Sequence, residues 1–470
     1  MLKRFILTPL AAAILSACAV GPDYHAPETR SAEKFDGIEG TYSPQEGVAQ
    51  FWNNFDDATL DRLVGEAEKL NYDVRIALSR VAEARALRRD VAFDLAPSIN
   101  AGGGYTRTKF AQDQAVVQPL AGTPRHNELY DAGFDAFWEL DFFGRVRRGV
   151  EASSAELGAV EAAERDALVI VTAEVTRTYF ELRGFQQQLD VARRNVVNQQ
   201  STLDLARARL EAGSGTEFDT ARAQAQLSAT LGTIAPLEAA VARSIHRLSV
   251  LVGREPGALR AELAPAHNLP ALPGIVPVGD PAGLLRRRPD IRVAERQLAG
   301  ATARIGVAVA DLFPRVTFTG SAGYVSATSS GLGDSGSEAY TVAPGISWAL
   351  FDLGHVQARI AASKAAREGA LLQYEKTVLN ALEETENSLV THARARDRLV
   401  HDEAAFKASS TAADLARVRY ENGASDFLQV LDAERTLLES EDRLARSRTE
   451  AATSLIAVYK ALGGGWQAGS

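Results

Sequence analysis

Four carboxylates lie on one face of a single short segment, where they could take part in acid–base chemistry. They are Asp131, Asp135, Glu139 and Asp141. General acid–base catalysis needs a second group that faces the first across a substrate. These four lie on one predicted strand with nothing opposite to act on, so we interpret them as the acidic lining of a water-filled passage that favours cations or water.

The sequence gives little indication of metal binding, phosphate binding, nucleophilic catalysis or nucleic-acid binding. The seven His residues show no ligand spacing, and Met1 is the only methionine, so a mature chain without it has no thioether for Cu(I). There is no phosphate-binding Gly loop and no nucleophile set; Gly463, Gly464 and Gly465 follow a predicted helix as its C-cap. The formal charge of -9 argues against nucleic acid as a partner. The sequence therefore predicts neither an enzyme, a cofactor nor a metal site.

Cys18 is the only cysteine of the chain, and its position suggests a modification. A basic start, an apolar run and small residues precede it, as in an export signal over residues 1–17. Leu15-Ser16-Ala17-Cys18 resembles a bacterial lipobox, in which the cysteine becomes the lipidated first residue; the alternative is an ordinary signal peptide with a chance cysteine. Ala19 follows where an Asp would signal inner-membrane retention, so we expect a lipid anchor in the outer membrane of a Gram-negative cell.

Leu428, Asp432 and Arg435 stand at helical spacing in the segment GASDFLQVLDAER. Leu428 and Asp432 are four residues apart and share one helix face. Asp432 and Arg435 are three apart, and by spacing alone a local ion pair on a solvated face is favoured.

Long helices are expected to position these residues. No proline interrupts the segment from Gly144 to Gly213, and steps of three and four residues along it form a heptad seam. This seam consists of Leu168, Val171, Val175, Thr178, Leu182, Phe185, Leu189, Ala192, Val196, Gln199, Leu203, Ala206 and Leu210. A second seam after the turn consists of Leu227, Leu231, Ile234, Glu238, Val241, Ile245, Leu248 and Val252. The two helices are predicted to form an antiparallel hairpin, kinked at Pro236.

The second half of the chain repeats the first. FWELDFFG at 137–144 is matched by SWALFDLG at 347–354, and ARARLEAGSGTEF is matched by ARVRYENGASDFL. Such ordered matches predict an internal duplication, with each copy built as helix, strand pair, helix, turn and helix.

Strands of about ten residues are predicted near 98–108, 129–142, 315–326 and 339–351, with apolar and polar residues alternating. A tilted strand of this length can cross a bilayer, and Tyr and Trp stand near the strand ends, as interfacial aromatic residues do. The alternative is a soluble sheet packed on helices. Even small barrels need about eight strands, and an open edge cannot lie in lipid. If these strands span a membrane, the chain must oligomerise.

Several motifs together resemble one family. CAVGPDY, FWNNFDDATL, RRRPDIRVAERQL, GASDFLQVLDAER and YKALGGGW occur in this order over nearly the whole chain. They resemble motifs of the outer membrane factors, the TolC-like efflux channels, and within them the lipidated OprM and NodT type. The resemblance implies a mainly α-helical homotrimer in which four strands per chain close a twelve-stranded barrel. The helices would form a periplasmic α-barrel, joined through a periplasmic adaptor to an inner-membrane transporter of the resistance-nodulation-division type.

The resemblance also assigns roles to residues at the two helix tips. Leu428, Asp432 and Arg435 would narrow the pore as a periplasmic gate, and Tyr420 is similar to a tyrosine that latches TolC shut. Gln429 stands where that latch has an acidic residue. The expected contacts with the adaptor are Gly213, Ser214, Gly215, Thr216, Gly423, Ala424 and Ser425.

The predicted organisation follows from these elements. It consists of a signal peptide (1–17), an N-terminal equatorial segment (18–58), a first repeat (59–255), a Pro-rich equatorial linker (256–281), a second repeat (282–462) and a tail (463–470). We expect a passive exit duct for drugs or other small toxic compounds. The alternatives are a duct for type I protein secretion and, in another class, a lipid-anchored periplasmic coiled-coil scaffold.

Overall fold

The computed structural model describes residues 19–28, 32–36, 42–43, 45, 49–109 and 126–466. The chain divides into two compact units. The first contains residues 81–160 and 293–374 with the described residues up to Glu28, and the second contains the described residues of 29–80, 161–292 and 375–470. Each predicted repeat thus contributes to both units. Among the described residues, no helix combines the length and the apolar character that a membrane crossing requires.

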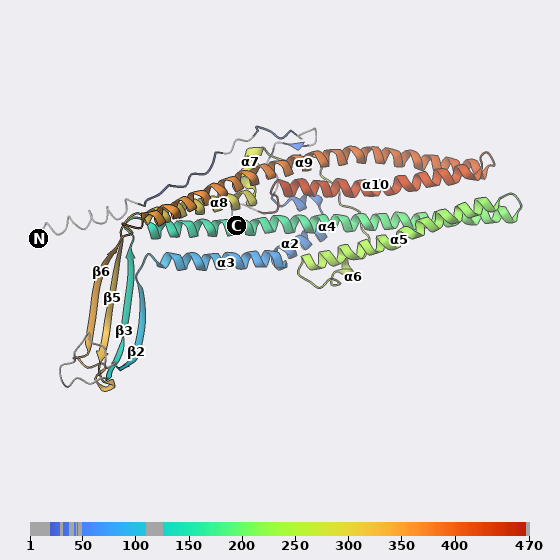
Figure 1. Ribbon diagram of the computed structural model, residues 1–470. Coiled ribbons are helices and arrows are strands. Elements are labelled where there is room, and N and C mark those ends of the chain that lie inside the picture. The colour runs from blue at the N-terminus through green and yellow to red at the C-terminus, as the bar shows by residue number, and fades with distance from the viewer. Residues whose placement is uncertain are drawn as a thin grey trace. The chain divides into compact units, whose positions relative to one another are not determined.

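Corresponding helices of the two repeats have nearly equal lengths. They are α3 (Tyr72–Phe93) and α8 (Pro289–Ala310), α4 (Arg145–Glu211) and α9 (Leu353–Glu421), and α5 (Glu217–Leu251) and α10 (Phe427–Ala461). The first pair has 22 residues each, the second 67 and 69, and the third 35 each. Near their shared turns, α4 runs beside α5 and α9 beside α10 (Figure 1). The predicted duplication and helical hairpins are confirmed.

The heptad seam predicted for α4 is confirmed, because none of its positions is exposed. The seam predicted for α5 is wrong in its middle. Leu231 is 47% exposed and Glu238 is also exposed, whereas Leu227 and Leu248 are buried. The reason is that α5 contributes to one hydrophobic cluster near each end and to neither between them. Pro236 lies inside this middle stretch, and the helix continues on both sides of it.

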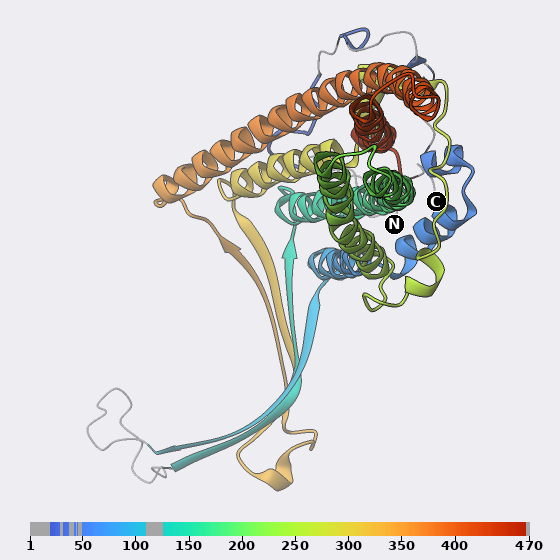
Figure 2. The ribbon, with the colours of Figure 1, turned by 90° about the vertical axis from the view of Figure 1, so that its right-hand side faces the viewer.

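Four antiparallel strands form one sheet in the first unit. They are β2 (Ser98–Lys109), β3 (His126–Leu140), β5 (Arg315–Ser326) and β6 (Glu338–Ser347), with a short 3₁₀ turn η3 (Ser329–Gly331) between the last two. The order is β2-β3-β5-β6, so β2 and β6 are the edge strands. Figure 2 shows the strands side by side and curving along their length. The second and fourth strands end before the predicted residues 142 and 351.

Trp138 and Trp348 make the same contact in the two repeats. The Trp138 indole N–H donates to the Leu95 carbonyl at 3.1 Å, and the Trp348 indole N–H donates to the Leu312 carbonyl at 3.0 Å. Trp348 follows the end of β6 rather than lying in the strand. Each indole therefore ties the end of one strand to the segment that leads into its neighbour.

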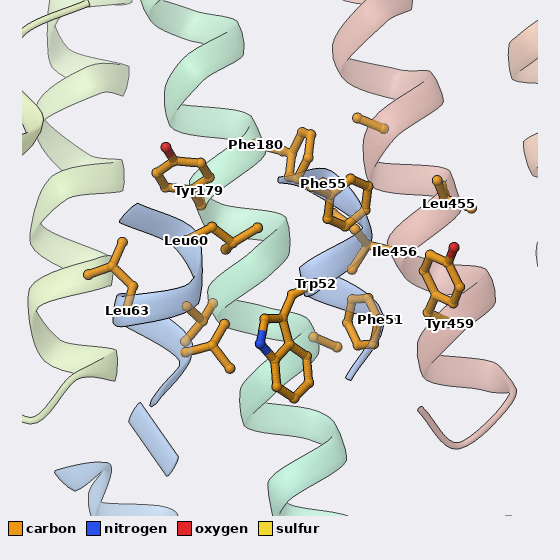
Figure 3. Close-up of a cluster of buried hydrophobic side chains, with 14 of the residues drawn as sticks. Phe51, Trp52, Phe55, Leu60, Leu63, Tyr179, Phe180, Leu455, Ile456 and Tyr459 are labelled. Atoms are coloured by element: carbon orange, nitrogen blue, oxygen red, sulfur yellow. The ribbon is translucent and has the colours of Figure 1, made fainter. Parts of the chain in front are cut away.

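An aromatic core organises the second unit, and the FWNNFDDATL motif supplies much of it. Its 3₁₀ turn η2 (Phe51–Phe55) precedes α2 (Ala58–Leu70). Phe51 stacks on Tyr459 with ring centroids 4.8 Å apart, and Phe55 meets Phe180 edge-on at 4.8 Å. Figure 3 shows these rings between α4 and α10. Burying such a side chain contributes roughly 1.5–3 kcal/mol, so the motif stabilises the packing of both hairpins.

The Pro-rich linker contains more structure than a segment without periodicity predicts. It includes α6 (Arg260–Leu263) and β4 (Val276–Pro277), and α7 (Pro281–Arg287) begins at its end. β4 pairs in parallel with β1 (Tyr42–Ser43) near the N-terminus. The Gly465 N–H donates to the Ala49 carbonyl at 2.7 Å, so the C-terminal segment meets the N-terminal one.

Within the RRRPDIR motif, Arg288 makes contacts that join several helices. Its guanidinium donates to the Ala461 carbonyl at 2.7 Å and pairs with Asp290 at 2.7 Å and Glu384 at 2.8 Å. The residue is only 9% exposed. Because α8 begins at Pro289, this one arginine joins the start of α8 to α9 and to the end of α10.

Candidate functional site

The first helix tip is a tight turn closed by backbone hydrogen bonds. Gly213 has φ +73°, which favours glycine, and the N–H groups of Ser214 and Gly215 donate to the Arg209 carbonyl at 2.9 and 3.0 Å. Thr216 caps α5 in a reciprocal capping box with Asp219, in which the Asp219 N–H donates to the Thr216 hydroxyl at 3.2 Å. The turn therefore has a defined shape.

The second tip repeats this geometry. Gly423 has φ +72°, and the Ala424 N–H donates to the Arg419 carbonyl at 2.8 Å. Asp426 caps α10 by accepting from the Gln429 N–H at 3.0 Å. The hydroxyl oxygen of Ser425 is buried without a hydrogen-bond partner in the described part of the chain. The turns lie where the sequence predicted them, while a contact of these residues with an adaptor stays a prediction.

A small hydrophobic cluster, the tip cluster, holds the two hairpins together near these turns. Its buried members are Leu203, Ala206, Ala223, Leu227, Tyr420, Phe427, Val430 and Leu431. Tyr420 is 3% exposed, and the Arg209 guanidinium lies 3.9 Å from its ring centroid. Burial raises the pKa of the Tyr420 hydroxyl. The structure thus places Tyr420 in the packing of one chain and away from the exposed face of α10.

The predicted gate residues lie on an exposed part of α10. Leu428 is 47% exposed. The side chains of Asp432 and Arg435 are 64% and 57% exposed and form an ion pair at 2.9 Å. The local pair that spacing favours is therefore present. An exposed ion pair contributes only about 0–1 kcal/mol, so it could be exchanged for another partner at low cost.

Two glutamates on α10 form a polar interface with α4 that the sequence analysis missed. Glu434 accepts from the Thr202 hydroxyl at 3.1 Å and pairs with Arg417 at 2.8 Å. Seven residues further along, Glu441 accepts from the Asn195 amide at 3.0 Å. A signal was available, because Glu434 and Glu441 have the same heptad spacing as Thr202 and Asn195 on the antiparallel partner.

The four predicted lining carboxylates fall into two groups. Asp131 and Asp135 belong to β3 and form the first group; Glu139, also in β3, and Asp141 form the second, because both contact the start of α4. Glu139 is bound by Arg145 through two contacts of 2.8 and 2.6 Å. Asp141 lies beyond the strand and accepts from the N–H groups of Val146 and Arg147 at 3.1 and 2.9 Å.

Asp141 therefore caps the start of α4, which explains why β3 ends at Leu140. Glu139 and Asp141 neutralise local positive charge, and the lining role predicted for them stays a prediction. Their side chains are only 12% and 11% exposed. For Asp131 and Asp135 the lining role also stays a prediction.

Cys18 lies outside the described residues, so its predicted lipidation stays a prediction. Within the described ranges, no three His, Cys, Asp or Glu side chains come together as a possible metal site.

Comparisons with known proteins agree on one family. The family model described as outer membrane efflux protein matches residues 63–254 and 281–464. The chain is 32% identical to outer membrane protein OprJ of Pseudomonas aeruginosa over 98% of this chain and 95% of that one. It is 30% identical to the toluene efflux pump outer membrane protein TtgI of Pseudomonas putida over 96% of each.

A solved structure extends this similarity to the fold. The outer-membrane channel OprN is 42% identical, with a TM-score of 0.89 over 96% of this chain and all of that one. The residues that the family model matches include both pairs of strands and both helical hairpins. The chain therefore belongs to the outer membrane efflux protein family and has the fold of the TolC-like outer membrane channels.

Proposed function

We propose that three copies of this outer membrane efflux protein form a passive exit duct of a tripartite efflux system. A periplasmic adaptor would open the duct, and an inner-membrane transporter of the resistance-nodulation-division type would supply the energy. The observation that carries the proposal is a sheet of four antiparallel strands whose outer strands, β2 and β6, each have one edge that no strand of the described residues pairs with.

The unpaired edges favour a closed trimer. In lipid, each unsatisfied backbone N–H or C=O group costs several kcal/mol, so an open sheet is unstable there. Four strands are too few for a barrel, since small barrels have about eight. Three copies would supply twelve strands, with β6 of one copy pairing with β2 of the next. Asp131 and Asp135 would then face the lumen.

Small toxic organic compounds are the proposed cargo. Two relatives are named as outer membrane proteins of toluene and solvent efflux pumps. The transporter, rather than this chain, would select the compounds. We infer no enzymatic activity, since the role is that of a duct.

The helix tips are the proposed gate and adaptor contact. Leu428 and Asp432 from three copies would form stacked rings one helical turn apart, the first excluding water and the second selecting charge. Arg435 would exchange its Asp432 partner when the adaptor engages the residues at the two turns. Tyr420, packed under Arg209, would act as a support for this face rather than as an exposed latch.

Cys18 is the proposed site of acylation, which would anchor the chain in the outer membrane. Replacing Cys18 with Ala should abolish labelling by palmitate. Labelling that persisted in the variant would refute this part of the proposal.

Conductance in planar bilayers tests the duct itself. We expect small currents from the purified trimer and larger ones from Asp432→Ala, because the ring of carboxylates and its ion pairs would be lost. Asp414→Ala is the matched control, since Asp414 is an exposed aspartate on α9. If neither the native protein nor Asp432→Ala conducts, the duct is refuted; equal currents from the two would refute the gate alone.

A further inference from the structure

The residues that follow Cys18 lie against the first unit in a defined way. We refer to Ala19–Tyr24 as the strap. The Val20 N–H donates to the Phe143 carbonyl at 3.1 Å, at the point where β3 gives way to α4. Ala19 packs on Gly144, where an added Cβ would come within 2.6 Å of the Ala19 Cα. The strap therefore starts in direct backbone contact with the strand-to-helix junction.

A second glycine pair brings the strap onto α8. Gly21 has φ +96°, and a Cβ on it would lie 2.5 Å from the Gly306 Cα. A Cβ on Gly306 would in turn lie 2.8 Å from the Arg148 Cγ. The absence of side chains at both positions lets the strap, α8 and Arg148 occupy the same small space.

We refer to the surface of α4 and α8 that the strap contacts as the seat. Arg148 of α4 lies at its centre and is only 5% exposed. Its guanidinium donates to the Val20 carbonyl at 3.2 Å, to the Asp23 carboxylate at 2.7 Å and to Glu151 at 2.7 Å. A buried charge that loses its partners is strongly destabilising. Two of these three partners belong to the strap, so without the strap the charge would keep only Glu151. The arginine also lowers the pKa of the Asp23 carboxyl.

Tyr24 closes the other end of the strap. Its hydroxyl donates to Glu295 of α8 at 2.7 Å, and the Arg296 guanidinium lies 5.6 Å from its ring centroid. Five of the six residues of the AVGPDY stretch thus contact the first unit, through two close backbone approaches, backbone hydrogen bonds of Val20, one carboxylate and one phenol.

The internal repeat provides a natural comparison. Gly354 of the second copy corresponds to Gly144, but no atom of the described residues lies within 4 Å of a Cβ added there. Ala358 stands where the first copy has Arg148. The seat is therefore a feature of the first copy alone rather than a general property of the strand-to-helix junction.

We propose that the strap and its seat on α4 and α8 hold the modified N-terminus against the strand-to-helix junction, with Arg148 as the positioning residue. This rests on the proposed acylation of Cys18, which is one peptide bond from Ala19. The acyl chains would then enter the membrane beside the strands of their own chain, and the anchor would act as a fixed point rather than a loose tether.

Hydrogen exchange of the purified full-length protein tests the seat. In Arg148→Met we expect exchange in the peptide covering residues 19–28 to be about tenfold faster, the effect of losing a charge-assisted hydrogen bond. Exchange in α10 should not change. Arg304→Met is the matched control, because Arg304 lies on α8 and pairs with Glu156, away from the strap. Asp23→Ala removes the exposed partner and so tests the same contact without risk to the core.

The outcomes distinguish a failure of the proposed seat from a failure of the proposed acylation of Cys18. Unchanged exchange of residues 19–28 in both Arg148→Met and Asp23→Ala would overturn the seat, whatever the labelling. Faster exchange there with normal palmitate labelling of Cys18 supports it. If the native protein takes up no palmitate, the acylation fails, and the proposal of an anchored N-terminus fails with it, even where exchange still shows a seated strap.

Discussion

Acidification should destabilise the second unit through His392. This side chain is 1% exposed, its Nδ1 lies 3.1 Å from the Ser454 hydroxyl, and its ring centroid is 6.2 Å from that of Tyr42. Burial, aided by the charge of Arg396, lowers the pKa of His392 to about 4 from its usual 6.5. The folded protein therefore keeps the imidazole neutral at pH values where an unfolded chain would protonate it.

The sign and size of the change in unfolding free energy follow from the difference in the pKa of His392 between the folded and the unfolded chain. Between pH 6.5 and 4 the unfolded chain binds more protons, so the contribution of His392 is fully present above that window and is lost as the pH falls through it. From pH 7 to pH 5 the free energy of unfolding should decrease by about 2 kcal/mol on account of this residue. Asp166, whose pKa burial raises to about 6, contributes with the opposite sign. The comparison must therefore be made against a His392 variant.

Urea unfolding of the detergent-solubilised protein at pH 7 and pH 5 measures the effect. His392→Gln should lose stability between these pH values by about 2 kcal/mol less than the native protein does. His401→Gln is the control, because His401 lies on the same helix and is exposed. Equal pH dependence in the native protein and His392→Gln would refute the reasoning.

Three further perturbations test other contacts. Arg288→Met should lower the free energy of unfolding by about 3 kcal/mol, because Asp290, Glu384 and the buried Ala461 carbonyl lose this partner; a thermal melt equal to that of the native protein would contradict the role of Arg288. Gly184→Ala should cost about 1–3 kcal/mol, because the new Cβ would lie 2.2 Å from the Thr449 hydroxyl oxygen. Adding Thr449→Ala should recover most of that loss, and additive losses in the double variant would exclude the steric explanation. Asp432→Ala should make cells more permeable to large antibiotics, measured as a lower growth-inhibiting concentration, and unchanged susceptibility would remove Asp432 from the gate.

The long-range organisation could be predicted because the sequence repeats its signals. The α4 seam, the strand alternation and the glycines of both turns each occur over several periods or in two copies, so local patterns determine them. The α5 seam failed in its middle because heptad spacing does not reveal whether a neighbouring helix is there to cover it. Leu231 has the expected spacing and no such cover in the described chain.

Single-residue roles were harder to predict, because they depend on contacts between distant segments. Asp141 has the same alternation as Asp131 and Asp135, and only its hydrogen bonds to the start of α4 distinguish a helix cap from a strand residue. Arg148 carries no periodic signal at all. Its role depends on a segment more than a hundred residues earlier and on a glycine of α8.

The separation of the two hydrophobic clusters has a consequence for local stability. The large aromatic core and the small tip cluster are joined along α4 and α10 by Glu434, Glu441 and their polar partners, and both amide atoms of Gln199 are buried there without a partner in the described chain. These polar contacts therefore interrupt the apolar packing between the two clusters, although buried residues such as Leu189 and Ala192 lie between them. Local opening free energies vary in this way within a protein. We therefore expect the tips to open locally at a lower free energy than the aromatic core.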